Sequence, residues 1–100
     1  MMPLYRGTLG FGDDFAGANI GQQGVADVVD ILAAVEAVRS KFGVTGELGV
    51  FGGSYGGYLT NKLMSSHPTR FACGVSEYGF LTIRPMTLEG GDLVRLALYF

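Results

Sequence analysis

Hydrophobic residues alternate between two spacings along the chain. Residues 23–41 carry apolar side chains at steps of three and four residues, which predicts a helix with one buried face that ends at Gly43. Residues 48–51 form a short apolar run that predicts a buried strand. Residues 55–66 return to the helical spacing, and residues 71–76 predict a second buried strand. The apolar positions expected on the first helix are Val25, Val28, Val29, Leu32, Val35 and Val38, and those on the second are Tyr58, Leu59, Leu63 and Met64.

The order helix, strand, helix, strand predicts an α/β fold. Strands that alternate with helices form a parallel sheet with right-handed crossover connections. Residues 5–21 are interrupted by glycines and predict a loop, and residues 92–100 are compatible with the beginning of a further helix. With 100 residues and no internal repeat, we expect one domain over residues 1–100.

Composition and charge narrow the class of protein. The chain is 48% hydrophobic and 16% charged, with a formal net charge of −2, and its basic residues form no stripe that would attract nucleic acid or an anionic membrane. No apolar run is long enough to span a bilayer, and the first residues do not resemble an export signal. Cys73 is the single cysteine, which excludes an internal disulfide or a cysteine-based zinc site and favours a reducing compartment. We therefore expect a cytoplasmic protein.

One motif carries chemistry. Residues 52–57 (GGSYGG) contain the pattern Gly-x-Ser-x-Gly between the first predicted strand and the second predicted helix, which is the context of a nucleophile elbow. Gly52 and Gly56 are expected to leave room for a tight turn, which would raise the Ser54 hydroxyl at the start of a helix. The backbone N–H of Tyr55 would then point to the oxyanion that forms when Ser54 attacks a carbonyl.

Other interpretations of these residues are weaker. The loop does not match the phosphate-binding patterns G-x-x-x-x-G-K-[ST] or G-x-G-x-x-G, and a glycine-rich turn before a helix is common without catalysis. His67, the only histidine, follows Ser54 by 13 residues at the far end of the predicted helix, about 20 Å away. It is therefore expected to end that helix rather than to act as a base. Asp92 follows the serine as a catalytic acid would, but a surface or capping role is favoured because no histidine comes after it.

Several motifs together resemble the prolyl oligopeptidase family of serine peptidases. They are residues 5–12 (YRGTLGFG), the helix with Asp27 and Asp30, residues 52–58 (GGSYGGY) and residues 67–71 (HPTRF), in the order and spacing of that family. The resemblance covers residues 4–80, and within the family it is strongest to acylaminoacyl peptidases.

The resemblance implies part of an α/β-hydrolase fold and the cleavage of short peptides through a Ser, Asp, His triad, without metal or organic cofactor. Ser54 matches the nucleophile, and Tyr55 supplies one N–H of the oxyanion hole. The triad Asp and His would follow Phe100, and the second oxyanion donor would precede Met1. We therefore expect the 100-residue chain alone to be inactive and prone to self-association. A carboxylesterase-type hydrolase and a non-catalytic truncated chain are the alternatives.

Overall fold

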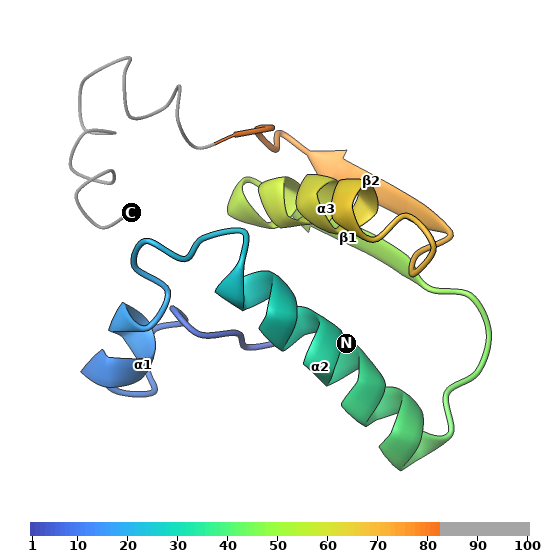
Figure 1. Ribbon diagram of the computed structural model, residues 1–100, viewed down its shortest axis with the longest axis horizontal. Helices are drawn as coiled ribbons and strands as arrows, with labels where there is room; N and C mark the ends of the chain where they lie inside the picture. Colours follow the sequence, from blue (N-terminus) through green and yellow to red (C-terminus); the bar gives the residue numbers. More distant parts are fainter. Residues whose placement is uncertain (83–100) are drawn as a thin grey trace. The chain divides into compact units, whose positions relative to one another are not determined.

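The computed structural model describes residues 1–82, which form two compact units. The first unit, Met1–Thr45, contains helices α1 (Asp13–Gly17) and α2 (Ala26–Phe42). Residues 46–82 belong to the second unit, which contains strand β1 (Gly49–Gly53), helix α3 (Tyr55–Ser66) and strand β2 (Cys73–Glu77) (Figure 1). Asp92 and the helix considered over residues 92–100 lie outside the described residues.

Helix α2 confirms the first predicted helix, and Val28 and Val35 are buried as predicted. Its buried apolar residues are Val28, Ile31 and Val35, which lie three and four residues apart. Val25 and Val29 were expected on this face, but they are 60% and 58% exposed. The prediction was wrong there because Val25 precedes the helix as its N-cap and Val29 lies on the opposite side from Ile31. Gly43 adopts the left-handed conformation at the C-cap (φ 62°), as predicted.

An ion pair ties the glycine-rich segment to α2. Both Nε and Nη2 of Arg6 donate to the carboxylate of Asp30, at 2.7 and 2.6 Å, and the backbone N–H of Arg6 donates to the same carboxylate at 3.0 Å. These hydrogen bonds from Arg6 lower the pKa of Asp30. Within this predicted loop, α1 is a five-residue helix that the hydrophobic pattern did not indicate.

The second unit is a β-α-β arrangement with a parallel sheet. β1 and β2 pair in parallel, with Gly49 opposite Cys73 and Gly53 opposite Glu77. This confirms the predicted parallel sheet, and α3 has the predicted bounds. Strand β2 begins and ends slightly later than predicted.

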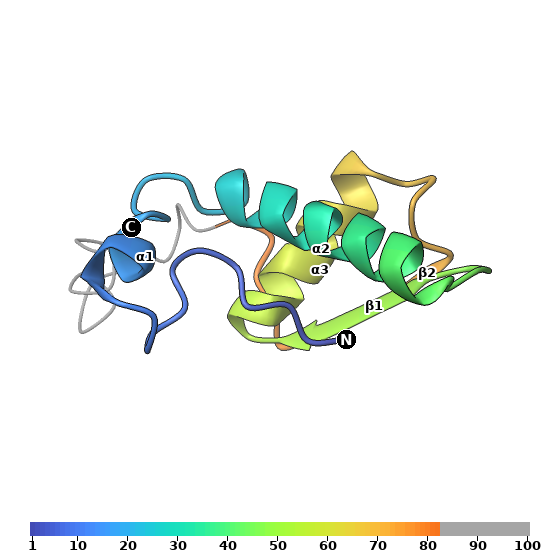
Figure 2. The ribbon, with the colours of Figure 1, turned by 90° about the horizontal axis from the view of Figure 1, so that it is seen from below.

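Helix α3 packs closely on one face of this sheet, as the two ribbon views show (Figures 1 and 2). The close approach depends on small residues. A Cβ at Gly74 would lie 2.7 Å from Cγ of Met64, and the Ser76 hydroxyl donates to the carbonyl of Gly57 at 3.1 Å. The side chains of Leu59 and Leu63 are buried, with 3% and 1% exposure.

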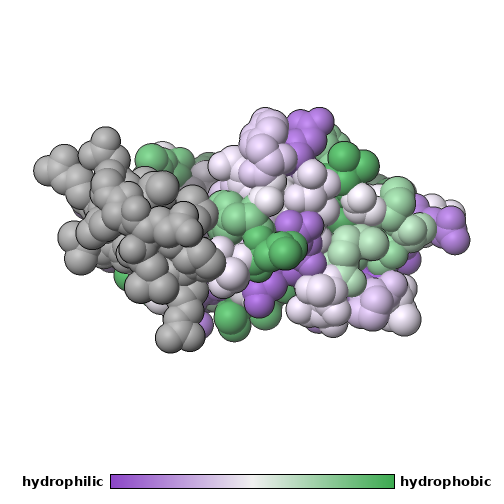
Figure 3. Space-filling model, turned by 90° about the horizontal axis from the view of Figure 1, so that it is seen from above, coloured by the Kyte–Doolittle hydropathy of each residue, from purple (hydrophilic) through white to green (hydrophobic). Residues whose placement is uncertain are grey.

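The other face of the sheet is open. Phe51 on β1 is 84% exposed and Val75 on β2 is 57% exposed, so the prediction of two buried strands was wrong for the described structure. Parallel strands become buried when helices cover both faces, and α3 covers one face in the described part of this unit. Hydrophobic residues are also visible at the surface in the space-filling view (Figure 3).

Candidate active site

Ser54 lies in a tight turn between β1 and α3. Its backbone angles are φ 54° and ψ −117°, which non-glycine residues rarely adopt, and the residue is exposed. Hydrogen bonds hold both sides of this residue, because its N–H donates to the carbonyl of Glu77 and its carbonyl accepts from the N–H of Tyr58, both at 3.0 Å. The strand, the positive φ and the helix give Ser54 the geometry that the motif predicts.

The two motif glycines have different roles in this turn. A Cβ at Gly52 would lie 2.5 Å from the carbonyl carbon and oxygen of Gly56, so β1 and α3 can meet here only without that side chain. A Cβ at Gly56 would meet nothing within 4 Å. The expectation that both positions must lack a side chain is therefore wrong for Gly56. The close approach involves its backbone, and its missing side chain would have pointed into open space.

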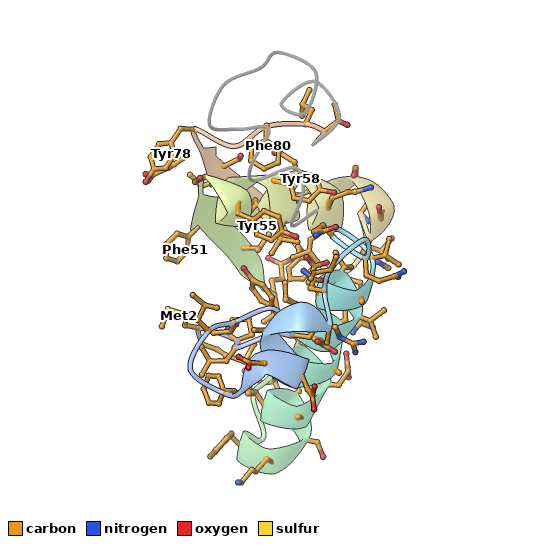
Figure 4. All side chains as sticks on the ribbon, turned by 90° about the vertical axis from the view of Figure 1, so that its left-hand side faces the viewer. Met2, Phe51, Tyr55, Tyr58, Tyr78 and Phe80 are labelled. Atoms are coloured by element: carbon orange, nitrogen blue, oxygen red, sulfur yellow. The ribbon has the colours of Figure 1, made fainter. Side chains whose placement is uncertain are left out.

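Tyr55 is the first residue of α3. The backbone N–H groups of a first helical turn point away from the helix, where they can stabilise negative charge together with the helix dipole. Its ring lies 5.4 Å from the ring of Tyr58 and 6.4 Å from that of Phe80. Figure 4 shows these three rings gathered on the side of the sheet that α3 covers. This aromatic packing fixes the side chain of Tyr55 and with it the start of the helix.

Three residues that the sequence did not single out also contact the turn. Glu77 accepts the hydrogen bond from Ser54, the phenol of Tyr78 lies against Gly53, and the backbone of Gly79 lies against Gly57. The available signal was the parallel arrangement, since ligand sites form outside the carboxyl ends of neighbouring parallel strands. The pairing register was needed to identify these particular residues.

His67 ends α3 and does not approach Ser54. It is the C-cap residue, and its N–H donates to the carbonyl of Leu63 at 2.9 Å while its carbonyl accepts from Arg70 at 3.0 Å. The prediction of a helix-ending turn is confirmed. His67 follows Ser54 by 13 residues, which corresponds to about 20 Å along the helix axis. Residues 1–82 thus place no histidine beside the serine.

The described residues offer no metal centre and no membrane span. Within residues 1–82, no three His, Cys, Asp or Glu residues come together as metal ligands. None of the described helices has the length and apolar character needed to cross a bilayer. Cys73 is exposed on β2.

Comparison with known proteins identifies the family of this chain. The model of the prolyl oligopeptidase family matches residues 1–91. Dipeptidyl peptidase family member 6 of Caenorhabditis elegans is 43% identical over 76 residues, which are 75% of this chain and 10% of that protein. The acylamino-acid-releasing enzyme of Arabidopsis thaliana is 37% identical over 73 residues, 72% of this chain and 10% of that protein. The same enzyme of Sus scrofa is 34% identical over 83 residues, 82% of this chain and 11% of that protein.

These matches confirm the resemblance inferred from the sequence motifs. The chain spans about a tenth of the length of the curated relatives it matches. The small parallel sheet with its helix is consistent with part of the α/β-hydrolase fold of such enzymes. The chain belongs to the prolyl oligopeptidase family.

Proposed function

We propose that the whole protein is a serine-type peptidase that hydrolyses short peptides through an acyl-enzyme on Ser54. The observation that carries this proposal is the exposed Ser54, at φ 54° between β1 and the N-terminus of α3. Family membership supports the same conclusion, because relatives are named as acylamino-acid-releasing enzymes and dipeptidyl peptidases.

The proposed reaction uses Ser54 as the nucleophile. Its Oγ attacks the carbonyl carbon of the scissile bond while a histidine outside the described residues accepts the hydroxyl proton. The N–H of Tyr55 donates to the oxyanion of the tetrahedral intermediate. The C–N bond then breaks, and the leaving amine takes the proton from the histidine. Water, deprotonated by the same base, attacks the acyl-enzyme and releases the acid and free Ser54. No cofactor enters these steps.

The names of the relatives support two substrate classes for this protein, namely peptides with an acylated N-terminus and peptides with a free N-terminus. An ester would react by the same steps, because ester and amide hydrolysis use the same nucleophile and oxyanion hole. The substrate class is therefore decided by comparing the hydrolysis rates of short N-acylated peptides, short peptides with a free N-terminus and simple acyl esters. A higher kcat/KM on peptides is expected, and a preference for acyl esters over every peptide would favour the carboxylesterase alternative.

Covalent labelling tests the nucleophile directly. The full-length protein is treated with a fluorophosphonate, which reacts with activated serines, and the modified peptide is identified by mass spectrometry. We expect the label on Ser54 and its loss in Ser54→Ala. Ser65→Ala is the matched control, because Ser65 is an exposed serine near the other end of α3. No label on Ser54 in the full-length protein would support the non-catalytic interpretation instead.

A further inference from the structure

Three consecutive residues at the end of β2 clamp the turn that holds Ser54. We call Glu77–Gly79 the clamp segment. The carbonyl of Glu77 accepts the N–H of Ser54 at 3.0 Å. At the other end, Cα of Gly79 would lie 2.6 Å from a Cβ placed on Gly57, so α3 and the clamp segment touch through their backbones. The clamp segment therefore contacts the turn on both sides of Tyr78.

The clamp segment and the turn each contain a non-glycine residue with a positive φ. Ser54 (φ 54°) and Tyr78 (φ 39°) are the two non-glycine residues with positive φ in the described part of the chain. Each directly follows a residue of the last register pair of the sheet, Gly53 opposite Glu77. Such conformations cost energy and persist only where surrounding contacts hold them. The contacts around Ser54 are thus part of what keeps it in the conformation that a nucleophile elbow requires.

The side chain of Tyr78 supplies one of these contacts. A Cβ at Gly53 would lie 2.6, 2.8 and 2.9 Å from Oη, Cζ and Cε2 of Tyr78, its three nearest neighbours. One edge of the phenol therefore lies against the Cα of Gly53, while Tyr78 as a whole is 80% exposed. Figure 4 shows Tyr78 pointing to the same side of the sheet as Phe51, away from α3. The ring packs on the open face, on the residue that precedes Ser54.

Packing on Gly53 matters because glycine gives the chain more freedom than any other residue. Strain at Ser54 can relax through rotation at Gly53 unless something prevents that rotation. A ring against the Cα of Gly53 obstructs movement toward the open face, while the hydrogen bond to Glu77 holds the N–H of Ser54.

We propose that Tyr78 is a positioning residue for the nucleophile, acting through Gly53 to hold the backbone of Ser54. This role rests on the proposed function of Ser54 and adds the residue that keeps the nucleophile in place. We assign it to the ring rather than to the hydroxyl, because Cζ and Cε2 approach Gly53 almost as closely as Oη, the nearest atom, and both remain in Tyr78→Phe.

Kinetics of the full-length protein test the role. Tyr78→Ala is expected to lower kcat and the fluorophosphonate labelling rate about tenfold or more, because a small displacement of a reacting atom slows the reaction strongly. KM is expected to stay within about twofold, since the ring acts on the nucleophile and not on the substrate. Tyr78→Phe keeps the ring and should stay near the wild-type rate. Phe51→Ala, which removes another exposed ring from the same face, should also leave kcat unchanged.

A raised KM with unchanged kcat in Tyr78→Ala would overturn the proposal and make Tyr78 a substrate contact. A decrease of kcat in Phe51→Ala as large as that in Tyr78→Ala would overturn it too, because the effect would then come from the whole sheet face. Loss of activity in Tyr78→Phe would assign the role to the hydroxyl and contradict the packing argument.

A double variant isolates the contact itself. Gly53 has no positive φ, so alanine fits its backbone and the phenol is the obstacle that Gly53→Ala meets. We expect Gly53→Ala to displace the ring, so that adding Tyr78→Ala causes little further loss. If the fold-decrease of kcat in the double variant equals the product of the two single fold-decreases, the residues act independently and the contact has no role.

Hydrogen exchange separates this proposal from the proposed function. The amide of Ser54 is protected by Glu77 whether or not the serine is reactive. Tyr78→Ala should speed its exchange, and an unchanged rate would overturn the clamp role. A wild-type protein that exchanges as expected but is never labelled at Ser54 would instead contradict the peptidase proposal alone, leaving the structural role of Tyr78 supported.

Discussion

Replacing Gly52 with alanine should damage the turn at Ser54 far more than replacing Gly56. The new methyl group at position 52 would lie 2.5 Å from two backbone atoms of Gly56, whereas carbon atoms in contact are normally about 3.5–4.0 Å apart. Strand β1 and helix α3 would have to separate by about 1 Å, and neither neighbour is a side chain that could rotate away. At position 56 the methyl group meets nothing within 4 Å.

The two substitutions are expected to change the stability of the turn in opposite directions and by different amounts. Overpacking of this kind costs about 1–3 kcal/mol, so Gly52→Ala should slow the labelling of Ser54 by roughly 30-fold if about 2 kcal/mol appears in the barrier. Gly56→Ala places a better helix former in the first turn of α3, which favours the helix by up to about 1 kcal/mol. Its labelling rate should stay within about threefold of the wild type.

The assay is the rate of fluorophosphonate labelling of Ser54 in the full-length protein, with thermal unfolding of each variant measured in parallel. The unfolding data show whether a slow variant is still folded at the assay temperature. Similar losses in both variants would refute the argument from the Gly52–Gly56 approach. A Gly52→Ala variant that labels at the wild-type rate would refute the geometry of the turn itself.

Three further predictions concern the ion pair, the isolated chain and the open sheet face. Asp30→Ala should speed amide exchange at Arg6. Because the pKa of Asp30 is lowered in the fold, this protection is present above its unfolded pKa of about 3.9 and lost as pH falls through the lower folded value. The amide of Arg6 should therefore exchange at the same rate in the variant and the wild type in strong acid. A difference in exchange rate that does not change with pH would show that the charge of Asp30 does not cause the protection. The 100-residue chain alone should show no peptide hydrolysis, and turnover that disappears in Ser54→Ala would contradict this. The same chain should self-associate through its open sheet face. Phe51→Lys, at a position that is 84% exposed, should shift sedimentation toward monomer, whereas a monomeric wild-type chain with a sharp melting transition would contradict the role of that face.

The sequence predicted the elements near Ser54 well because local signals define them. Helix α3 begins directly after the turn and ends at His67, where capping and Pro68 stop it, so its predicted bounds match the structure. The start of α2 is at Ala26 rather than Gln23, since no capping side chain marks it. The five-residue α1 is too short to produce a hydrophobic period.

Features that depend on pairing and coverage could not be predicted in this way. An apolar run identifies a strand but not what covers it, so the exposure of Phe51 was missed. The contact between Tyr78 and Gly53 follows from the parallel register, which the spacing of residues along one strand does not contain. The motif also treats Gly52 and Gly56 alike, although only the direction of each missing Cβ decides which one is sterically required.

The short β-α-β path from Gly49 to Glu77 has a consequence for folding. The contacts that shape the turn, including the hydrogen bond from Ser54 to Glu77, lie within this stretch and the two residues that follow it, Tyr78 and Gly79. The entropy cost of closing a loop grows slowly with its length, so pairing β1 with β2 across one intervening helix needs no segment distant in sequence. The shape of the turn at Ser54 can thus be set by this one stretch of the chain.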